Sequence, residues 1–293
     1  MTDIRFLAPL TIDEAVAAFA AAQGAARILA GGTDLLVQMR NGVARPGTII
    51  DIKGIAELTA ITEAADGSFC VGAAVSGAAL AEHARFGKIW PGVLEAINLI
   101  GSSQIQGRAS AGGNLCNASP AGDSVPALVA AGAVVTIQGP NGRRQMPVEA
   151  FPTGPGRTSL TPGEIVVSLT LPPRPPGSAD AYLRMIPRTE MDIAVVGVGV
   201  SLTMVQGVVT AARVGLGAVA PTVLLVADAA RALVGSKLDD AAVEAAAAAC
   251  RAACNPINDK RGTITYRIKA AGVLLRRTVA IAAERAPRGA TGN

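Results

Sequence analysis

The sequence contains little of what most catalytic and metal-binding classes of protein need. Its 293 residues include one histidine, His83, and four cysteines, and aromatic side chains make up 3% of the chain. One histidine cannot supply a histidine-rich metal site, and no Ser/His/Asp set surrounds it. Cys250 and Cys254 lie four residues apart in a helical run, which is not the spacing of a paired-cysteine metal knuckle. We therefore expect no catalytic residue and no metal site in this chain, and we interpret His83 as structural.

Charge and long hydrophobic runs are also scarce. Charged residues make up 16% of the chain and the formal net charge is +4, with arginines scattered and no aromatics between them, so no nucleic-acid surface is indicated. No run of roughly 20 apolar residues predicts a transmembrane segment, and the first residues do not resemble a signal peptide. We expect a cytoplasmic protein with reduced cysteines. The low charge fits either an ordinary alanine-rich surface or one that partner subunits cover.

Glycine is plentiful, and it is concentrated in one segment. Residues 101–130 read GSSQIQGRASAGGNLCNASPAGDSVPALVA, in which glycines and prolines alternate with short polar side chains. Gly112 and Gly113 permit tight or left-handed backbone. Such a backbone can approach a ligand closely, offer it N–H groups and surround it with hydroxyl and amide side chains.

A second glycine turn lies far upstream, at residues 30–35 (AGGTDL). A short strand is predicted at residues 27–30 and a helix over 35–39. This order directs free N–H groups and the positive end of a helix toward an anion, although a tight turn without a ligand has the same pattern. Our hypothesis is that the two loops close on one large phosphate-bearing cofactor.

The remaining pattern predicts an α+β protein in two parts, joined by the proline-rich segment LPPRPPGS at residues 171–178. The first part mixes both element types, and Asn141-Gly142 predicts a hairpin turn within it. Strands come first and helices later in the second part, which is typical of a small α+β domain. Helices are predicted over 12–22, 80–86, 91–100, 125–131, 221–234, 240–253 and 263–284, and strands over 49–52, 71–73, 133–138, 165–171, 182–185, 194–204 and 208–217.

One apparent dinucleotide motif is rejected. Residues 215–220 (GLGAVA) fit the G-x-G-x-x-A form, but they end a predicted antiparallel hairpin and Pro221 follows directly. The motif has meaning only where it opens a strand–turn–helix unit.

Four motifs together resemble the FAD-binding medium subunit of molybdenum hydroxylases, the family of xanthine dehydrogenase and the carbon monoxide dehydrogenase flavoprotein. They are residues 30–35, 104–123 (QIQGRASAGGNLCNASPAGD), 151–164 (with its GPGRT and PGE) and 188–194 (RTEMDIA), in order over nearly the whole chain. The resemblance implies a two-part vanillyl-alcohol-oxidase-type FAD-binding domain over 1–175, with subdomains at about 1–56 and 57–175. It implies a C-terminal domain over 178–286, with a three-stranded antiparallel sheet and three helices. We expect the tail, 287–293, to be disordered.

The resemblance also implies which residues contact FAD. The first loop would donate N–H groups to the pyrophosphate, and residues 110–114 would form a second wall, in which Ser110-Ala111 replaces the more usual threonine-isoleucine. Asn114 and Ser119 would bond the diphosphate or ribityl chain, and Asp123 would accept from ribose or ribityl hydroxyls. Ile100 would pack near the adenine, Val166 near the isoalloxazine, and Arg184 falls where many relatives place a lysine near the flavin. The implied site comprises Leu29, Ala30, Gly31, Gly32, Thr33, Asp34, Leu35, Ile100, Ser110, Ala111, Gly113, Asn114, Ser119, Asp123, Val166 and Arg184.

The implied function is that of a flavin electron-transfer subunit, which takes electrons from 2Fe–2S clusters onto FAD and passes them to an external acceptor. The chain has no cysteine cluster for iron–sulfur ligation, so the clusters and the molybdopterin cofactor are expected in partner chains. These partners would be a large molybdenum subunit and a small 2Fe–2S subunit, assembled as a dimer of heterotrimers. The alternatives are a stand-alone FAD-dependent oxidoreductase of the same fold and a scaffold that has lost its cofactor. The substrate and the electron acceptor are not determined.

Overall fold

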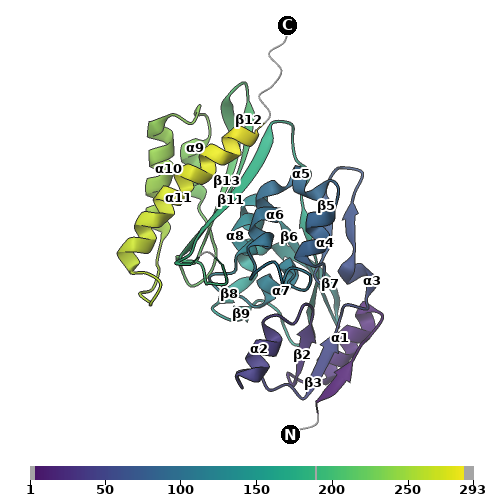
Figure 1. The fold of residues 1–293 in the computed structure, drawn as a ribbon. Coiled ribbons are helices and arrows are strands. Elements are labelled where there is room, and N and C mark those ends of the chain that lie inside the picture. Colours follow the sequence, from purple (N-terminus) through teal and green to yellow (C-terminus); the bar gives the residue numbers. More distant parts are fainter. Residues whose placement is uncertain (1–3, 189, 287–293) are drawn as a thin grey trace.

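The computed structural model describes residues 4–188 and 190–286, so the predicted disordered tail lies outside the described residues. Three sheet-containing parts follow one another along an elongated molecule (Figure 1). The N-terminal part lies at the bottom of this view, a larger sheet with several helices occupies the middle, and the C-terminal sheet and its helices lie at the upper left. A mixed α/β architecture of this kind agrees with the predicted fold class.

The N-terminal part is a small parallel sheet of three strands in the order β1-β3-β2. Thr11 caps its first helix as predicted, since its side-chain oxygen accepts from the N–H of Glu14 at 3.3 Å. That helix buries Ala15 and Val16. The elements are β1 (Arg5–Leu7), α1 (Ile12–Ala21), β2 (Ala26–Leu29), α2 (Leu35–Arg40) and β3 (Thr48–Asp51).

The middle part contains a five-stranded antiparallel sheet in the order β4-β5-β10-β6-β7. The predicted hairpin joins β6 to β7, but its two turn residues are Pro140 and Asn141, and Gly142 is already the first residue of β7. Helix α8 is buried along its whole length because it lies between this part and the C-terminal sheet, where it contacts β12 and β13. The elements are α3 (Ala56–Thr59), β4 (Ile61–Glu63), β5 (Phe69–Gly72), α4 (Gly77–Glu82), α5 (Phe86–Ile89), α6 (Pro91–Asn98), α7 (Ala111–Cys116), α8 (Ser124–Ala131), β6 (Val134–Gly139), β7 (Gly142–Pro147), η1 (Val148–Ala150), β8 (Pro152–Gly154), β9 (Arg157–Thr158) and β10 (Ile165–Leu171).

The helix predicted over residues 80–86 is instead two short helices, α4 and α5, that are separated by residues 83–85. The chain turns there because His83 Nδ1 accepts from the N–H of Phe86 at 3.1 Å. The imidazole also stacks edge-on against Phe69, with 5.8 Å between ring centroids. The lone histidine therefore has a structural role, as its sequence context indicates.

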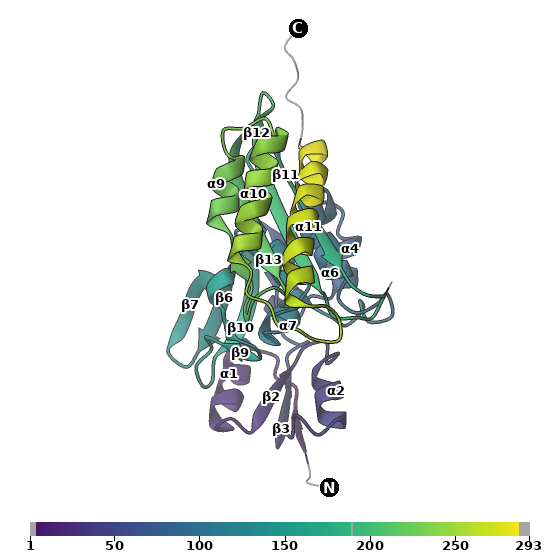
Figure 2. The same cartoon turned by 90° about the vertical axis from the view of Figure 1, so that its left-hand side faces the viewer.

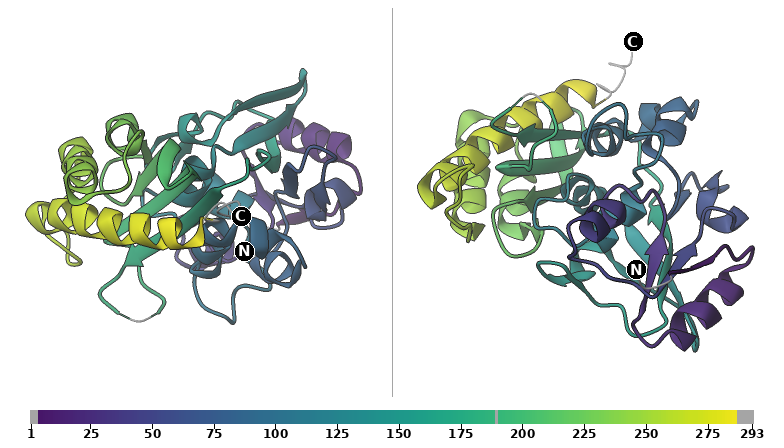
Figure 3. Two further views of the ribbon diagram at one scale, coloured as in Figure 1. Left: turned by 90° about the horizontal axis from the view of Figure 1, so that it is seen from above. Right: turned by 60° about the horizontal axis from the view of Figure 1, so that its bottom comes forward.

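The C-terminal part is an antiparallel sheet in the order β11-β12-β13-β14, with three helices on the side away from the middle part (Figure 3). The three predicted strands and three helices are present, and the two-residue strand β14 extends the sheet. Because β14 pairs with β13, the helix predicted from residue 221 begins only at Ala227. The elements are β11 (Ser178–Met185), β12 (Val196–Val205), β13 (Val208–Gly217), β14 (Leu224–Leu225), α9 (Ala227–Leu233), α10 (Asp240–Ala253) and α11 (Ile264–Arg285).

The rejected dinucleotide motif has a packing explanation. Gly215 and Gly217 lie in β13 against α8, and a Cβ atom on Gly215 would lie 2.2 Å from the carbonyl oxygen of Pro126. The glycines let a strand and a buried helix approach closely. The predicted domain division at residues 171–178 coincides with the segment between β10 and β11, and it stays a prediction.

Candidate cofactor site

A deep cavity lies between the N-terminal and middle parts of the molecule. The empty space between its lining atoms is about 1120 Å³, a figure that includes open solvent. Both predicted glycine loops border it. The predicted site residues that line the cavity are Ala30, Gly31, Gly32, Thr33, Asp34, Leu35, Ile100, Ser110, Gly113, Asn114 and Val166.

The two glycine loops touch each other through their main chains. A Cβ atom on Gly31 would lie 2.0 Å from the carbonyl oxygen of Arg108, which belongs to the second loop. The second loop also lies close to the end of β5, because a Cβ atom on Gly112 would lie 2.4 Å from the carbonyl oxygen of Ala73. Real Cβ contacts are never this short, so only glycine permits the approach. The structure therefore brings together loops that lie about eighty positions apart in the sequence, as our hypothesis requires.

The first loop presents main-chain donors to the cavity. Within the described residues, the N–H groups of Gly32, Thr33 and Asp34 donate to no protein acceptor. Lys53 holds the turn from behind, because its Nζ donates to the carbonyl oxygen of Ala30 at 3.1 Å and pairs with Asp51 at 2.6 Å. Unsatisfied N–H groups on a fixed turn favour an anionic ligand such as a diphosphate.

The second loop is pre-shaped by its own side chains. Ser110 Oγ accepts from the N–H of Gly113 at 3.0 Å, so this donor is already occupied. Asn114 Oδ1 accepts from the N–H and hydroxyl of Ser124 at 3.2 and 2.8 Å, which leaves the Asn114 amide nitrogen as its donor. A ligand on this wall would therefore meet the Asn114 amide rather than the N–H of Gly113.

Five predicted site residues lie outside the cavity lining. Leu29 packs beneath the first turn, Ala111 is buried at the start of α7, and Ser119 Oγ accepts from the N–H of Ala121 at 3.2 Å. Asp123 and Arg184 form a buried ion pair at 2.9 Å, in which Arg184 also donates to the carbonyl oxygen of Leu99, next to Ile100.

Asp123 is only partly satisfied by this pairing. Its Oδ1 is buried and accepts no hydrogen bond from the described residues. Burial raises the pKa of Asp123 to about 6, and the charge of Arg184 only partly offsets the effect of burial. The pair lies behind the wall at Ile100 in this structure, so direct contact between Asp123 or Arg184 and a cofactor stays a prediction.

Several residues that line the cavity were not among the site residues predicted from the sequence. Gln38 of α2 donates to Asn117 Oδ1 at 3.1 Å, and this contact joins the N-terminal part to the second loop. Asn117 lies within the glycine-rich motif, which is the one signal that could have found it. The lining residues absent from our expectations include Phe19, Arg27, Gln38, Asn117, Leu160 and Glu164.

Glu164 fixes the loop that carries Leu160. Arg144 donates to both of its carboxylate oxygens at 2.6 and 2.8 Å, and the N–H of Thr161 adds a third bond at 2.7 Å. These bonds, chiefly that of Arg144, lower the pKa of Glu164 to about 2. The folded state thus prefers the ionised carboxylate.

This preference predicts a loss of stability in acid. Because the pKa is lower in the folded than in the unfolded chain, the contribution of Glu164 is complete above its ordinary pKa and disappears as the pH falls toward 2. We expect Glu164→Gln to show a smaller drop in urea midpoint than the wild type between pH 5 and pH 2.5. Parallel curves for the two proteins would contradict the assigned role.

Two family profiles match the chain. Residues 2–174 match the FAD binding domain in molybdopterin dehydrogenase, and residues 181–282 match the CO dehydrogenase flavoprotein C-terminal domain. Among individual proteins, the carbon monoxide dehydrogenase medium chain of Afipia carboxidovorans is 35% identical over 95% of this chain and 96% of its own length. The xanthine dehydrogenase FAD-binding subunit of Escherichia coli is 35% identical over 67% of this chain and 68% of its own length.

Solved structures of related chains also match this chain over nearly its whole length. A chain of a Cu,Mo-CO dehydrogenase crystal structure superposes with a TM-score of 0.92 at 34% identity, covering 97% of this chain and 98% of that one. A chain of quinoline 2-oxidoreductase from Pseudomonas putida superposes with a TM-score of 0.87 at 27% identity, over 96% and 97% of the two chains. None of the helices in residues 4–188 and 190–286 has the length and hydropathy needed to cross a membrane.

Proposed function

Because the chain belongs to the family of FAD-binding subunits of molybdopterin dehydrogenases, we propose that it is the electron-transfer subunit of a multi-subunit molybdenum hydroxylase. In this role it receives electrons from 2Fe–2S clusters and delivers them to an external acceptor. The observation that carries the proposal is the contact of Gly31 with Arg108, which closes two main-chain loops around one cavity. FAD, when bound, supplies the capacity to take up electrons singly and release them as a pair.

The protein's own groups bind and orient the cofactor. The free N–H groups of Gly32, Thr33 and Asp34 are positioned to hold the diphosphate, and the amide of Asn114 provides a donor on the opposite wall. Ile100 and Val166 supply apolar surface for the ring systems. The chemistry of the donor set therefore fits FAD, and we assign no proton-transfer role to any residue.

The names of the relatives support the proposed partners. Carbon monoxide dehydrogenase and nicotine 6-hydroxylase each have a medium chain or medium subunit that resembles this protein, the latter 29% identical over 96% of the chain. The proposed complex contains a large molybdopterin subunit and a small 2Fe–2S subunit, paired as a dimer of heterotrimers. A cytoplasmic location is proposed with it, and the free state of Cys70, Cys116, Cys250 and Cys254 supports a reducing compartment.

The proposal predicts that the isolated chain is a flavoprotein without hydroxylase activity. Purified with FAD, it should show flavin absorbance at one FAD per chain, and acid precipitation should release the flavin because no histidine is available for covalent attachment. It should not oxidise candidate N-heterocycles or carbon monoxide by itself. Hydroxylation by the isolated chain would contradict the proposal, and flavin-dependent oxidation of an alcohol would favour the stand-alone oxidoreductase.

A further inference from the structure

Arg267 is a buried arginine near the start of α11, in the C-terminal part of the molecule, and it is only 3% exposed. Its Nη1 donates to the carbonyl oxygens of Val195 at 2.7 Å and Ala218 at 3.1 Å, and its Nη2 pairs with Asp259 at 2.8 Å. One planar guanidinium therefore joins three segments that lie far apart in the chain. They are the residue before β12, the residue after β13 and the connection between α10 and α11.

The contact with Ala218 leads on to the second glycine-rich loop. The N–H of Ala218 donates to the carbonyl oxygen of Pro120 at 2.7 Å. Pro120 follows three residues after Asn117, which lines the cavity and accepts a hydrogen bond from Gln38. Ala218 thus connects Arg267 to the second loop through its own two main-chain groups, the carbonyl on one side and the N–H on the other.

The backbone on both sides of this connection is one that alanine adopts only at a cost. The φ angle is +64° at Ala218 and +47° at Ala118, in the left-handed region that favours glycine. Both alanines are buried, and the carbonyl oxygen of Ala118 accepts from the N–H of Gly156 at 3.0 Å. Such conformations persist only where the surrounding structure imposes them. At Ala218 the bonds that do so are those to Pro120 and Arg267.

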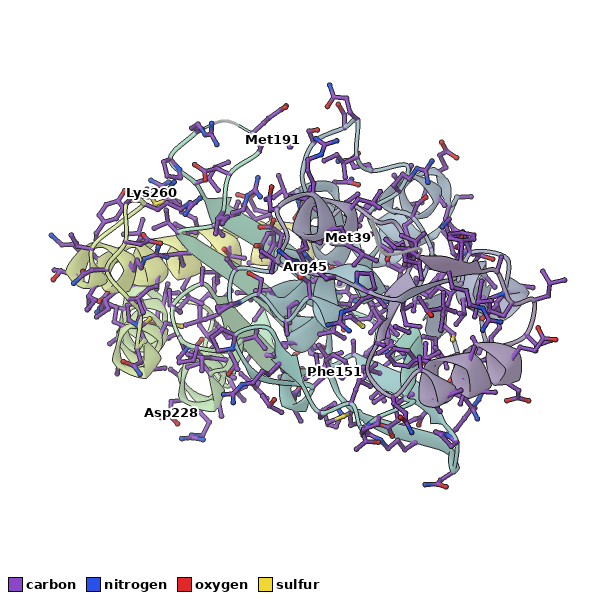
Figure 4. All side chains as sticks on the ribbon, turned by 90° about the horizontal axis from the view of Figure 1, so that it is seen from below. Met39, Arg45, Phe151, Met191, Asp228 and Lys260 are labelled. Atoms are coloured by element: carbon purple, nitrogen blue, oxygen red, sulfur yellow. The ribbon has the colours of Figure 1, made fainter. Side chains whose placement is uncertain are left out.

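Arg267 lies where the C-terminal part meets the second loop. Figure 2 shows that α11 begins at the lower end of the C-terminal part, at about the level of α7. The bond to Val195 fixes the end of the loop between β11 and β12. An ion pair of 2.9 Å joins this loop to the connection between α10 and α11, and Met191 and Lys260 mark these two segments on one flank of the molecule (Figure 4).

We propose that Arg267 is a positioning residue for FAD, which acts through Ala218 to hold residues 117–120 of the second loop in the shape that the cavity wall requires. The residues that line the cavity run from Phe19 to Val166, so Arg267 acts through other residues and is not catalytic. The inference rests on the proposed function, because it takes FAD as the ligand of the cavity. It adds a contribution of the C-terminal part to FAD affinity.

Titration of the folded apoprotein with FAD separates positioning from general stability. Arg267→Lys keeps a cation beside Asp259 but loses the planar fork that reaches two carbonyls and a carboxylate together. We expect this variant to bind FAD about tenfold more weakly and to alter the visible circular dichroism of the bound flavin.

Leu275→Ala is the matched control. Leu275 is fully buried in the same helix, so its truncation should lower the melting temperature at least as far as Arg267→Lys does. We expect the control to keep the FAD affinity and the flavin spectrum of the wild type. Wild-type affinity in Arg267→Lys, or an equal loss of affinity in Leu275→Ala, would overturn the proposal.

A second substitution tests the route through Ala218. Glycine adopts the left-handed backbone without strain, so Ala218→Gly should not change the FAD affinity where Arg267 already holds that backbone. In the Arg267→Lys background, Ala218→Gly should raise the affinity about threefold, because the conformation no longer has to be imposed. Equal effects in the two backgrounds would mean that the two residues are not coupled, and this result would also overturn the proposal.

A milder variant covers the case in which Arg267→Lys does not fold. Asp259→Asn removes only the charge that pairs with Nη2, and we expect it to weaken FAD binding about threefold. Wild-type affinity in this variant would then overturn the proposal. Failure of the wild-type apoprotein to bind FAD would instead contradict the proposed function.

Discussion

Replacement of Gly31 by alanine is expected to weaken FAD binding by about fivefold to more than a hundredfold. The added methyl group would lie 2.0 Å from the carbonyl oxygen and 2.6 Å from the carbonyl carbon of Arg108, and neither main-chain atom can move aside as a side chain would. The two loops must then separate, at a cost typical of overpacking, about 1–3 kcal/mol. Titration of the apoprotein with FAD, followed by flavin fluorescence, measures the change.

Gly107→Ala is the matched control for this prediction. Gly107 lies in the same glycine-rich segment as the contacted residue, Arg108, but a Cβ atom there would meet nothing within 4 Å. Its backbone is not in the left-handed region, so alanine is tolerated. We expect wild-type affinity from Gly107→Ala. Equal affinity for Gly31→Ala would mean that close contact between the loops does not shape the site.

Removal of the Asp180 carboxylate should destabilise the protein by about 3–5 kcal/mol. Asp180 Oδ1 pairs with Arg174 at 2.7 Å, and its Oδ2 accepts from the N–H of Val93 at 3.0 Å, in the first turn of α6. The side chains of Asp180 and Arg174 are only 4% and 10% exposed, and the guanidinium lies 4.4 Å over the ring of Trp90. Asp180→Ala leaves the buried guanidinium of Arg174 without a counter-ion, although it still donates to the carbonyl oxygen of Ile89, and it leaves the N–H of Val93 without its side-chain acceptor. Urea denaturation measures the loss, which is a large part of a typical folding free energy.

An exposed ion pair provides the comparison. Asp228 and Arg231 pair on the surface of α9, with side chains 67% and 73% exposed, so Asp228→Ala should cost about 1 kcal/mol or less. If Asp180→Ala were as mild as this control, the buried pair would not hold α6 to β11. The difference between the two variants isolates the effect of burial.

The local elements of this fold were predictable because their determinants are close together in the chain. Thr11 caps α1 through an N–H three residues away, and the hairpin signal of Asn141-Gly142 lies within one residue of the turn that joins two adjacent strands. The strand–turn–helix around Gly31 is likewise contained in one short segment, residues 26–40. The division of one predicted helix at His83 is also a local effect, but it depends on an imidazole accepting a main-chain hydrogen bond, which helical periodicity does not reveal.

Residues that act through distant partners were not predictable in the same way. Gly215 looks like part of a nucleotide motif until Pro126, some ninety positions away, is placed against it. Asp123 was predicted to accept from ribose or ribityl hydroxyls of FAD, and Arg184 was predicted to lie near the flavin. The structure pairs the two with each other across 61 positions, which the sequence did not indicate, and their contacts with FAD stay predictions. Gln38 gave no signal, because only the approach of α2 to α7 brings Asn117 within its reach.

By itself, the sequence determined that this protein has two glycine loops able to accommodate a large anionic cofactor, since glycine spacing and flanking strands and helices are properties of the local chain. Only the tertiary structure decided that the loops touch, which N–H groups remain free, and which polar side chains are already bonded. Those outcomes depend on contacts between segments far apart in the chain, and such contacts form only when the three parts of the molecule pack together.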